Sequence, residues 1–296
     1  MRHYVANGLD LAPGDEVLTS DQEHSGGKGA WDLKARRWKT TVRMVALPKP
    51  AHSPGEIIDI FRKAIAPETR VLMIQHLITG SGAILPVKEI CAEARAKGIF
   101  TVIDGAQAVG HIPVDIKNIG CDAYIGCFHK WMLAPAGTGF LYIRKERIKD
   151  VWVTLASGSW DDYEDDGHRF TQRGTGSLSL LLGLEAALDF HFAIGPDRVH
   201  KRIKELGDRL RDGLRRIPKT RLFSPADPAM CAGITVWNIE GMTGPQLQDE
   251  LWNRGRLRPR SSGEQFGVRQ STHIYNSPEE IDRTLAIARE LAAGAC

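Results

Sequence analysis

Short apolar runs alternate with amphipathic stretches through the first half of the chain. The runs are EVLTS (16–20), VRMVAL (42–47), RVLMIQHL (70–77), IFTVID (99–104), DAYIGC (122–127) and GFLYIR (139–144), and helical patterns lie at 31–38, 54–65 and 86–97. This alternation is typical of βαβ units around a mostly parallel sheet. Only a loop separates the last two runs, so we expect one antiparallel strand at the end of the sheet. The pattern predicts an α/β fold with flanking helices.

The pattern changes from about residue 177 onward. The apolar stretch SLSLLLGLEAALDFHFAIG is followed by a charged helical pattern from Pro196 to Arg216, by short strand-like runs and by the helical pattern SPEEIDRTLAIARELAA. We interpret this region as a long connecting helix and a smaller α+β domain. The predicted division is a large domain over residues 1–190 and a small C-terminal domain over residues 191–296.

Composition narrows the class of protein. The chain has 296 residues with 42% hydrophobic and 25% charged content, which is ordinary for a globular protein. A net charge of +3 gives no polyanion footprint, so we expect no nucleic-acid partner. The five cysteines are dispersed without metal-type spacing, which favours reduced thiols in the cytoplasm. No run approaches the roughly 20 apolar residues of a membrane helix, so we expect no membrane partner. The acidic loop at 159–169 is interpreted as a solvated loop, and no metal site is expected.

An aspartate and a lysine suggest the chemistry. Asp104 closes an apolar run in VIDGAQ, and Lys130 follows it by 26 positions (130 minus 104) in GCFHKW. A lysine that forms an imine with an aldehyde cofactor needs a carboxylate that keeps the pyridine nitrogen protonated, because the positive ring is the electron sink. His24 and Thr79 also fall just beyond predicted strand ends, where open α/β sheets place their ligands.

Several segments in a fixed order extend this likeness to almost the whole chain from Gly8 onward. They are GDEVLTSDQEH, TRVLMIQHLITGSGAILPVKEI, VIDGAQAVGHIPVDIKNIGCDAYIGCFHKW, GTGFLYIR and VRQSTHIYNSPEEIDR. In these segments the chain resembles the class V aminotransferases of the fold type I pyridoxal-phosphate (PLP) enzymes. The HKW and STHIYN runs are similar to those of isopenicillin N epimerase-like proteins, while cysteine desulfurases and selenocysteine lyases resemble the chain more distantly. The resemblance implies PLP as the cofactor and a mostly parallel sheet of the seven-stranded type.

The resemblance also implies roles around the cofactor ring. Lys130 matches the imine lysine, and Asp104 matches the residue that pairs with the pyridine nitrogen. Gln107 matches the side chain that hydrogen-bonds the ring hydroxyl. His24 matches a histidine that stacks on the ring and takes part in proton transfer, and Thr79 stands beside the ring, where desulfurases carry an asparagine.

Four further residues match contacts to the phosphate, the partner subunit and the substrate. His129 matches a phosphate contact, and Cys127 replaces a serine that contacts the phosphate in the family. Thr175 matches a threonine that reaches the phosphate of the neighbouring subunit's cofactor, which implies a homodimer. Arg269 matches the arginine that grips the substrate carboxylate, a role that its planar fork suits better than a lysine does. The nearby Arg256, Arg258 and Arg260, at period two, are interpreted as a solvated strand edge, with a second anion site as the alternative.

The chain departs from the family at its start, because Met1 falls inside the helix that follows the family's phosphate-binding loop. We therefore expect an N-terminally truncated member, with a gene fragment favoured over a genuinely shortened protein. The expected reaction is that of an aminotransferase or an epimerase, with a PLP-dependent carbon–sulfur lyase as an alternative. Desulfuration is disfavoured, because residues 255–268 contain no cysteine nucleophile. A truncated, non-catalytic paralogue is a further alternative.

Overall fold

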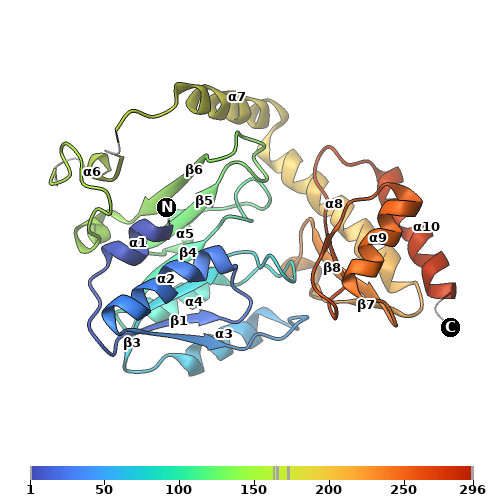
Figure 1. Cartoon of the computed structure of the whole chain (residues 1–296), viewed down its shortest axis with the longest axis horizontal. Coiled ribbons are helices and arrows are strands. Elements are labelled where there is room, and N and C mark those ends of the chain that lie inside the picture. Colours follow the sequence, from blue (N-terminus) through green and yellow to red (C-terminus); the bar gives the residue numbers. More distant parts are fainter. Residues whose placement is uncertain (1, 163, 165–166, 172–173, 295–296) are drawn as a thin grey trace.

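A computed structural model describes residues 2–162, 164, 167–171 and 174–294, and its main feature is a six-stranded sheet (Figure 1). The strands lie in the order β2-β1-β3-β4-β5-β6. Neighbours from β2 to β5 are parallel, and β6 is antiparallel to β5. The bounds are β1 Glu16–Ser20, β2 Thr41–Val45, β3 Thr69–Gln75, β4 Phe100–Asp104, β5 Ala123–Cys127 and β6 Gly139–Ile143.

Helices cover both faces of this sheet, which explains why its central strands are apolar throughout. Leu72 and Ile74 of β3 pack into a core with α3 and α4 on one face. Val71 and Met73 of the same strand pack into a second core with α1 and α2 on the other face. The helices of this region are α1 Arg2–Gly8, α2 Ser25–Trp38, α3 Pro54–Ala64, α4 Val87–Arg95, α5 Ile116–Ile119, the 3-10 helix η1 Lys145–Asp150 and α6 His168–Thr171.

A second, antiparallel sheet lies beyond the helices α7 and α8 (Figure 1). Its four strands have the order β7-β8-β10-β9, and a core of buried residues joins one of its faces to α8, α9 and α10. The elements are α7 Leu178–Ile194, α8 Pro196–Arg215, β7 Thr220–Leu222, the 3-10 helix η2 Pro228–Met230, β8 Ile234–Ile239, α9 Gly244–Gly255, β9 Arg260–Ser261, β10 Val268–Ser271 and α10 Pro278–Gly294.

The α/β class, the flanking helices and the antiparallel last strand are as predicted. Within the described residues the main sheet has six strands, one for each apolar run, where the fold type implies seven. The predicted boundary between residues 190 and 191 falls inside α7, and the division into domains there stays a prediction. No single helix in the described part of the chain is long and apolar enough to cross a membrane; α7 and α8 meet that criterion only as a pair bent by 79°.

The three arginines at period two do not lie on one strand, which corrects that interpretation. Arg256 caps the C-terminus of α9 in the left-handed conformation, with φ 52°. Arg258 lies in the loop that follows, and only Arg260 belongs to a strand, β9. The spacing of two between these arginines thus spans the end of a helix, a loop and the start of a strand.

Candidate active site

Most predicted site residues lie at one edge of the main sheet. The strands β1, β3, β4 and β5 are parallel neighbours, so their carboxyl ends meet at this edge. His24 follows β1, Thr79 follows β3, Asp104 ends β4 and Lys130 follows β5. The sheet order therefore brings together residues that are up to about a hundred positions apart in the sequence.

His24 forms the N-cap of α2. Its Nδ1 accepts a hydrogen bond from the backbone N–H of Gly26 at 3.1 Å. Because Nδ1 is the acceptor, the neutral ring carries its proton on Nε2. The cap thus fixes both the tautomer and the orientation of an exposed imidazole at the edge of the site.

Asp104 is buried at the end of β4, with 2% of its surface exposed. Its Oδ1 accepts the backbone N–H of Ala106 at 3.0 Å, an arrangement that turns the chain away from the strand. Tyr124 packs directly against this turn. A Cβ added at Gly105 would stand only 2.3 Å from the Tyr124 hydroxyl oxygen. Glycine is therefore required for the aspartate to sit where it does.

A second carboxyl group, that of Glu23, lies near Asp104, and sequence reasoning did not single it out. Its Oε1 accepts hydrogen bonds from Ser20 Oγ at 2.9 Å and from the backbone N–H of Gln75 at 3.2 Å. Its Oε2 is buried without a hydrogen-bond partner among the described residues. Burial raises the pKa of Glu23 to about 8, and the charge of Asp104 adds to this rise against hydrogen bonds that lower it. Glu23 is therefore mostly protonated at neutral pH.

Thr79 is held by the side chain of Gln75. Both its backbone N–H and its hydroxyl donate to Gln75 Oε1 at 3.2 Å. Gln75 Nε2 in turn donates to the backbone carbonyl of Gln22 at 2.8 Å. The Gln75 side chain thus joins the segment after β1 to the segment after β3. Gln75 also stands opposite Asp104 in the β3–β4 register.

Lys130 lies in the loop between β5 and β6, between His129 and Trp131. His129 is tethered through its Nδ1 to the carbonyl of Thr138 at 3.1 Å, and Lys130 is half-buried. Cys127 is the last residue of β5 and stands opposite Gly139 of β6. Cys127, His129 and Lys130 thus all lie at the end of β5 or within the first residues of the loop that follows it.

Gln107 contacts Trp131 next to the lysine. Trp131 Nε1 donates to Gln107 Oε1 at 2.8 Å. Trp131 is buried, with 4% exposed, and its ring is stacked between those of His111 and His273. The HKW and STHIYN runs, which carried the family resemblance, therefore contact each other in space.

Arg269 reaches the site from the second sheet. It stands opposite Val236 in the β8–β10 register, and residues directly opposite in an antiparallel pair share a face. Val236 packs in a core that also contains Trp131 and Leu77 of the main-sheet region. Arg269 is thus on the face of the second sheet that is turned toward the Lys130 loop.

The environment of Arg269 suits an anionic ligand. Its Nε is buried without a hydrogen-bond partner in the described part of the chain. Burial lowers the pKa of the guanidinium, and the like charge of Arg260, opposite on β9, lowers it further. A carboxylate bound here would relieve both penalties.

A cation–π contact joins the loop before β10 to the main-sheet region. Lys49 Nζ lies 3.7 Å from the centre of the Phe266 ring. Burial lowers the pKa of Lys49 to about 8, against the opposing effect of Asp21. This contact anchors the loop that leads to Arg269.

Thr175 stands apart from these residues. It is exposed in the segment that precedes α7. Its contact with the cofactor phosphate of a neighbouring subunit stays a prediction.

Comparisons with known proteins identify the family of the chain. The class-V aminotransferase family profile matches residues 2–284. Isopenicillin N epimerase from Streptomyces clavuligerus is 33% identical over 98% of the chain and 77% of its own length. A probable cysteine desulfurase from Xylella fastidiosa is 32% identical over 93% of the chain and 69% of its length.

Solved structures give the same result. A cystine C–S lyase in complex with its product, cysteine persulfide, superposes with a TM-score of 0.85 at 26% identity, over 97% of this chain and 78% of its own. The apo cysteine desulfurase from Thermococcus onnurineus NA1 has a TM-score of 0.85 at 25% identity, over 99% and 77%. The chain therefore belongs to the class-V aminotransferase family, whose members are PLP-dependent enzymes.

Proposed function

We propose that the chain is a PLP-dependent enzyme that acts on the α-carbon of an amino acid, as an aminotransferase or an epimerase-like enzyme, with Lys130 as the residue that carries the cofactor. The observation that carries this proposal is the convergence of Asp104, Gln107 and Lys130 at one sheet edge, with Arg269 facing them from the second sheet. The sequence similarity to isopenicillin N epimerases supports the epimerase side of the proposal.

The buried polar groups at this edge fit PLP. Asp104 is almost fully buried, and the neighbouring Glu23 has a buried Oε2 with no hydrogen-bond partner among the residues that the structure describes. A buried carboxylate beside a protonated carboxyl suits the cationic pyridine nitrogen of the cofactor. The buried Nε of Arg269, which has no hydrogen-bond partner within the described ranges of the chain, suits the carboxylate of an amino acid.

Each proposed cofactor contact has a physical basis. Asp104 would hold the ring nitrogen in its protonated form, and Gln107 would donate from Nε2 to the ring hydroxyl. His24 would stack on the ring, with Thr79 beside it. His129 and Cys127 would bind the phosphate, and a thiol donates more weakly than the serine of the family.

The reaction depends on which residues hold and move the α-proton. PLP supplies an electron sink for the bond that breaks at the substrate α-carbon. Arg269 orients the substrate by its carboxylate, and Lys130 Nζ takes the α-proton. In an epimerase His24 would act as the second acid and return a proton to the same carbon from the opposite face, whereas in an aminotransferase Lys130 Nζ would pass the proton on without returning it to that carbon.

A carbon–sulfur lyase is the second candidate, because the fold closely matches that of a cystine C–S lyase. Such an enzyme needs the same α-proton transfer followed by loss of the β-substituent. A persulfide-forming desulfurase remains disfavoured, since the loop at 255–268 has no thiol.

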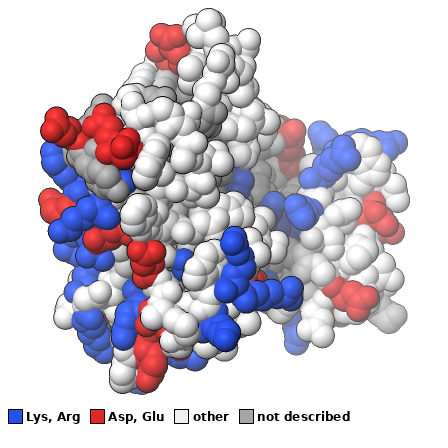
Figure 2. Space-filling view, turned by 60° about the vertical axis from the view of Figure 1, so that its left-hand side comes forward, with Lys and Arg blue, Asp and Glu red and all other residues white. Residues whose placement is uncertain are grey.

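We also propose a homodimer in which the second copy covers α7. Leu178, Leu181 and Phe192 are 67%, 59% and 69% exposed on this helix. Figure 2 shows few charged side chains over the upper part of the molecule, where α7 lies in Figure 1. Thr175 lies just before α7, so the contact that buries the helix would bring this threonine to the partner subunit's cofactor phosphate.

The remaining partner and location proposals rest on composition. The four described cysteines are free thiols, and three are buried. We propose a cytoplasmic protein with an amino acid as its small-molecule substrate and without nucleic-acid, membrane or metal partners.

The test is an absorbance spectrum of the full chain mixed with PLP and desalted. We expect a visible band that is missing in Lys130→Ala and present in Lys117→Ala, which removes an exposed lysine of α5. Absence of the band from all three proteins would contradict the proposal and favour the non-catalytic paralogue or gene fragment.

With the loaded protein, amino acids incubated in deuterated water distinguish the reactions. Deuterium at the α-carbon with inversion identifies an epimerase, an oxo acid without sulfide identifies an aminotransferase, and sulfur release from cysteine or cystine identifies a lyase.

A further inference from the structure

Trp131 is the centre of a stack of four rings, which lie in loops of the main-sheet region and in the segment that follows β10 of the second sheet. Its ring lies 3.5 Å from that of His111, with an interplanar angle of 14°. On the other side the ring of His273 lies at 5.2 Å, and Tyr275 stacks on His273 at 4.7 Å. Trp131 thus has aromatic contacts on both faces and cannot tilt without displacing a histidine.

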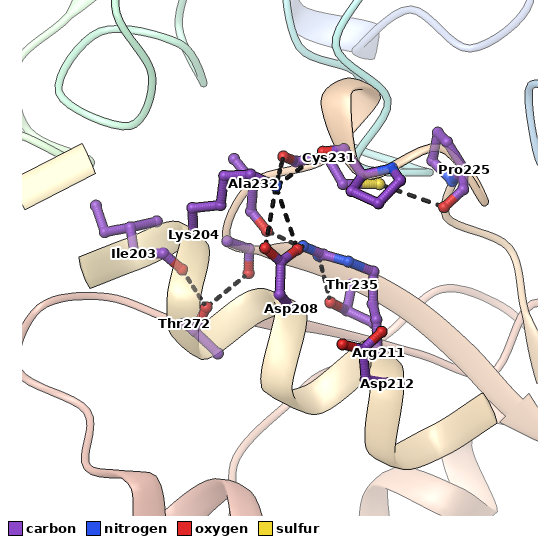
Figure 3. Close-up of polar contacts among 12 residues, drawn as sticks. Ile203, Lys204, Asp208, Arg211, Asp212, Pro225, Cys231, Ala232, Thr235 and Thr272 are labelled. Atoms are coloured by element: carbon purple, nitrogen blue, oxygen red, sulfur yellow. Dashed lines mark hydrogen bonds and ion pairs between the residues drawn. The ribbon is translucent and has the colours of Figure 1, made fainter. Parts of the chain in front are cut away.

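The His111 side of the stack is fixed by the loop that precedes β8. His111 Nε2 accepts the backbone N–H of Gly233 at 2.7 Å. This loop is held by α8, since the buried Arg211 donates to the carbonyl of Ala232 at 2.7 Å and Lys204 donates to that of Cys231 at 3.4 Å (Figure 3). The position of His111 is therefore determined by the second sheet.

The His273 side is fixed by the segment that follows β10. His273 Nε2 donates to the backbone carbonyl of Trp131 at 3.0 Å, because its Nδ1 already accepts the N–H of Ile274 at 2.8 Å. The hydroxyl of Thr272 donates to the carbonyl of Gly233 at 3.1 Å, which ties this segment to the loop before β8.

Both histidines are neutral over the pH range in which enzymes of this kind work. Burial lowers the pKa of His111 to about 3, against a hydrogen bond to Gln107, and burial also lowers that of His273. The other titratable groups that act on the stack are His191, His200 and Arg211. At neutral pH neither histidine therefore adds a charge to the stack.

The indole of Trp131 determines which way the Gln107 amide points. An indole N–H can only donate, so the atom 2.8 Å from it must be the carbonyl oxygen Oε1. The amide is planar, and Nε2 is therefore turned away from Trp131. Among the described residues no hydrogen bond uses this Nε2.

We infer that Trp131 is a positioning residue that orients Gln107, so that Nε2 of this amide donates to the hydroxyl oxygen of the PLP ring. The inference rests on the proposed function, because the acceptor belongs to the cofactor. Without the indole contact the amide can rotate and present its oxygen, which repels the ring oxygen. Through Trp131, which does not touch the reacting atoms, the loops around the second sheet would thereby favour the anionic form of the ring oxygen.

The test is the pH titration of the visible band of the lysine-bound cofactor in Trp131→Phe, which keeps the stacked ring and loses the N–H. A donor to the ring oxygen favours its anionic form and lowers the pH midpoint of the band. We therefore expect Trp131→Phe and Gln107→Leu each to raise the midpoint by about 1 pH unit. The double variant should show the same midpoint as Gln107→Leu alone, since the two residues act in series. Trp252→Phe, on the exposed face of α9, is the matched control and should leave the midpoint unchanged.

A second measurement needs no cofactor and covers the case in which Trp131→Phe does not fold. The indole N–H of Trp131, observed by 15N NMR, should exchange with solvent more slowly in the wild type than in Gln107→Leu. Equal exchange rates would overturn the inference, as would unchanged midpoints or additive shifts in the double variant. If the wild type shows no visible band, the proposed function fails and the inference with it, whereas a band with an unmoved midpoint overturns only the inference.

Discussion

The backbone N–H of Gly233 lies 2.7 Å from His111 Nε2, a contact between residues that are 122 positions apart in the chain. An added Cβ at Gly233 would stand 2.5 Å from the carbonyl oxygen of Thr272 and 2.6 Å from Ile203 Cγ2. Both distances are shorter than packed atoms allow. The glycine is needed so that the two loops around Trp131 approach each other.

We expect Gly233→Ala to lower the free energy of unfolding by about 1–3 kcal/mol, because the backbone must shift to admit the methyl group. Urea unfolding measures this change. The control is Gly29→Ala, since Gly29 is exposed in α2 with nothing within 4 Å of an added Cβ. That variant should gain about 0.5–1 kcal/mol from helix propensity, and a loss in it comparable to that of Gly233→Ala would contradict the steric explanation.

The strands and the site edge were predictable because their signals are local. Each apolar run of the first half became one strand, and the position of a polar residue just after a run placed His24, Thr79, Asp104 and Lys130 at a common edge. Sheet order supplied the rest, since parallel neighbours end on the same side.

The ring stack and the protonation of Glu23 were not predictable from local patterns. The stack unites His111, Trp131 and His273 from three separate segments, and no spacing in the sequence reveals which rings will face one another. The pKa of Glu23 depends on burial and on Asp104, which only the folded sheet brings near. The prediction that Arg256, Arg258 and Arg260 share one strand edge was wrong, because the spacing of two does not reveal that α9 ends with its cap at Arg256.

The raised pKa of Glu23 makes a prediction about stability and pH. Between pH 4.5, the ordinary pKa of a glutamate, and a pH of about 8, the carboxyl is ionised in the unfolded chain and protonated in the folded protein. The folded state thus binds more protons in this window, so the contribution of Glu23 to stability falls as pH rises. Glu23→Gln removes this titration. The free energy of unfolding of the variant minus that of the wild type should therefore increase by about 2–4 kcal/mol as the pH rises from 5 to 8. Chemical denaturation across this range measures the difference, and parallel profiles for the two proteins would count against a buried, protonated Glu23.

The exposed apolar face of α7 makes a prediction about assembly. A charge introduced in the centre of an apolar contact leaves an unpaired, desolvated group. We expect Leu181→Lys or Phe192→Lys to weaken self-association by about 100-fold or more, measured by analytical ultracentrifugation. Trp252→Lys, at a residue 41% exposed on α9, is the control and should leave the mass unchanged. A wild-type protein that sediments as a monomer at micromolar concentration would rule out the proposed dimer.

Arg269 makes a prediction about substrate binding. Its guanidinium lies on the face turned toward Lys130. The buried Nε has no hydrogen-bond partner among the residues described in the structure, which suits it to one arm of a bidentate carboxylate contact. A lysine keeps the charge but provides one point contact, so Arg269→Lys should weaken amino acid binding by about 10- to 100-fold. The loss should appear in the amino acid concentration that half-saturates the change in the visible band, while the band of the protein without substrate stays in place. Arg258→Lys, in the exposed loop before β9, is the matched control. Equal half-saturation in all three proteins would assign the carboxylate to another residue, whereas a loss confined to Arg269→Lys would identify this guanidinium as its anchor.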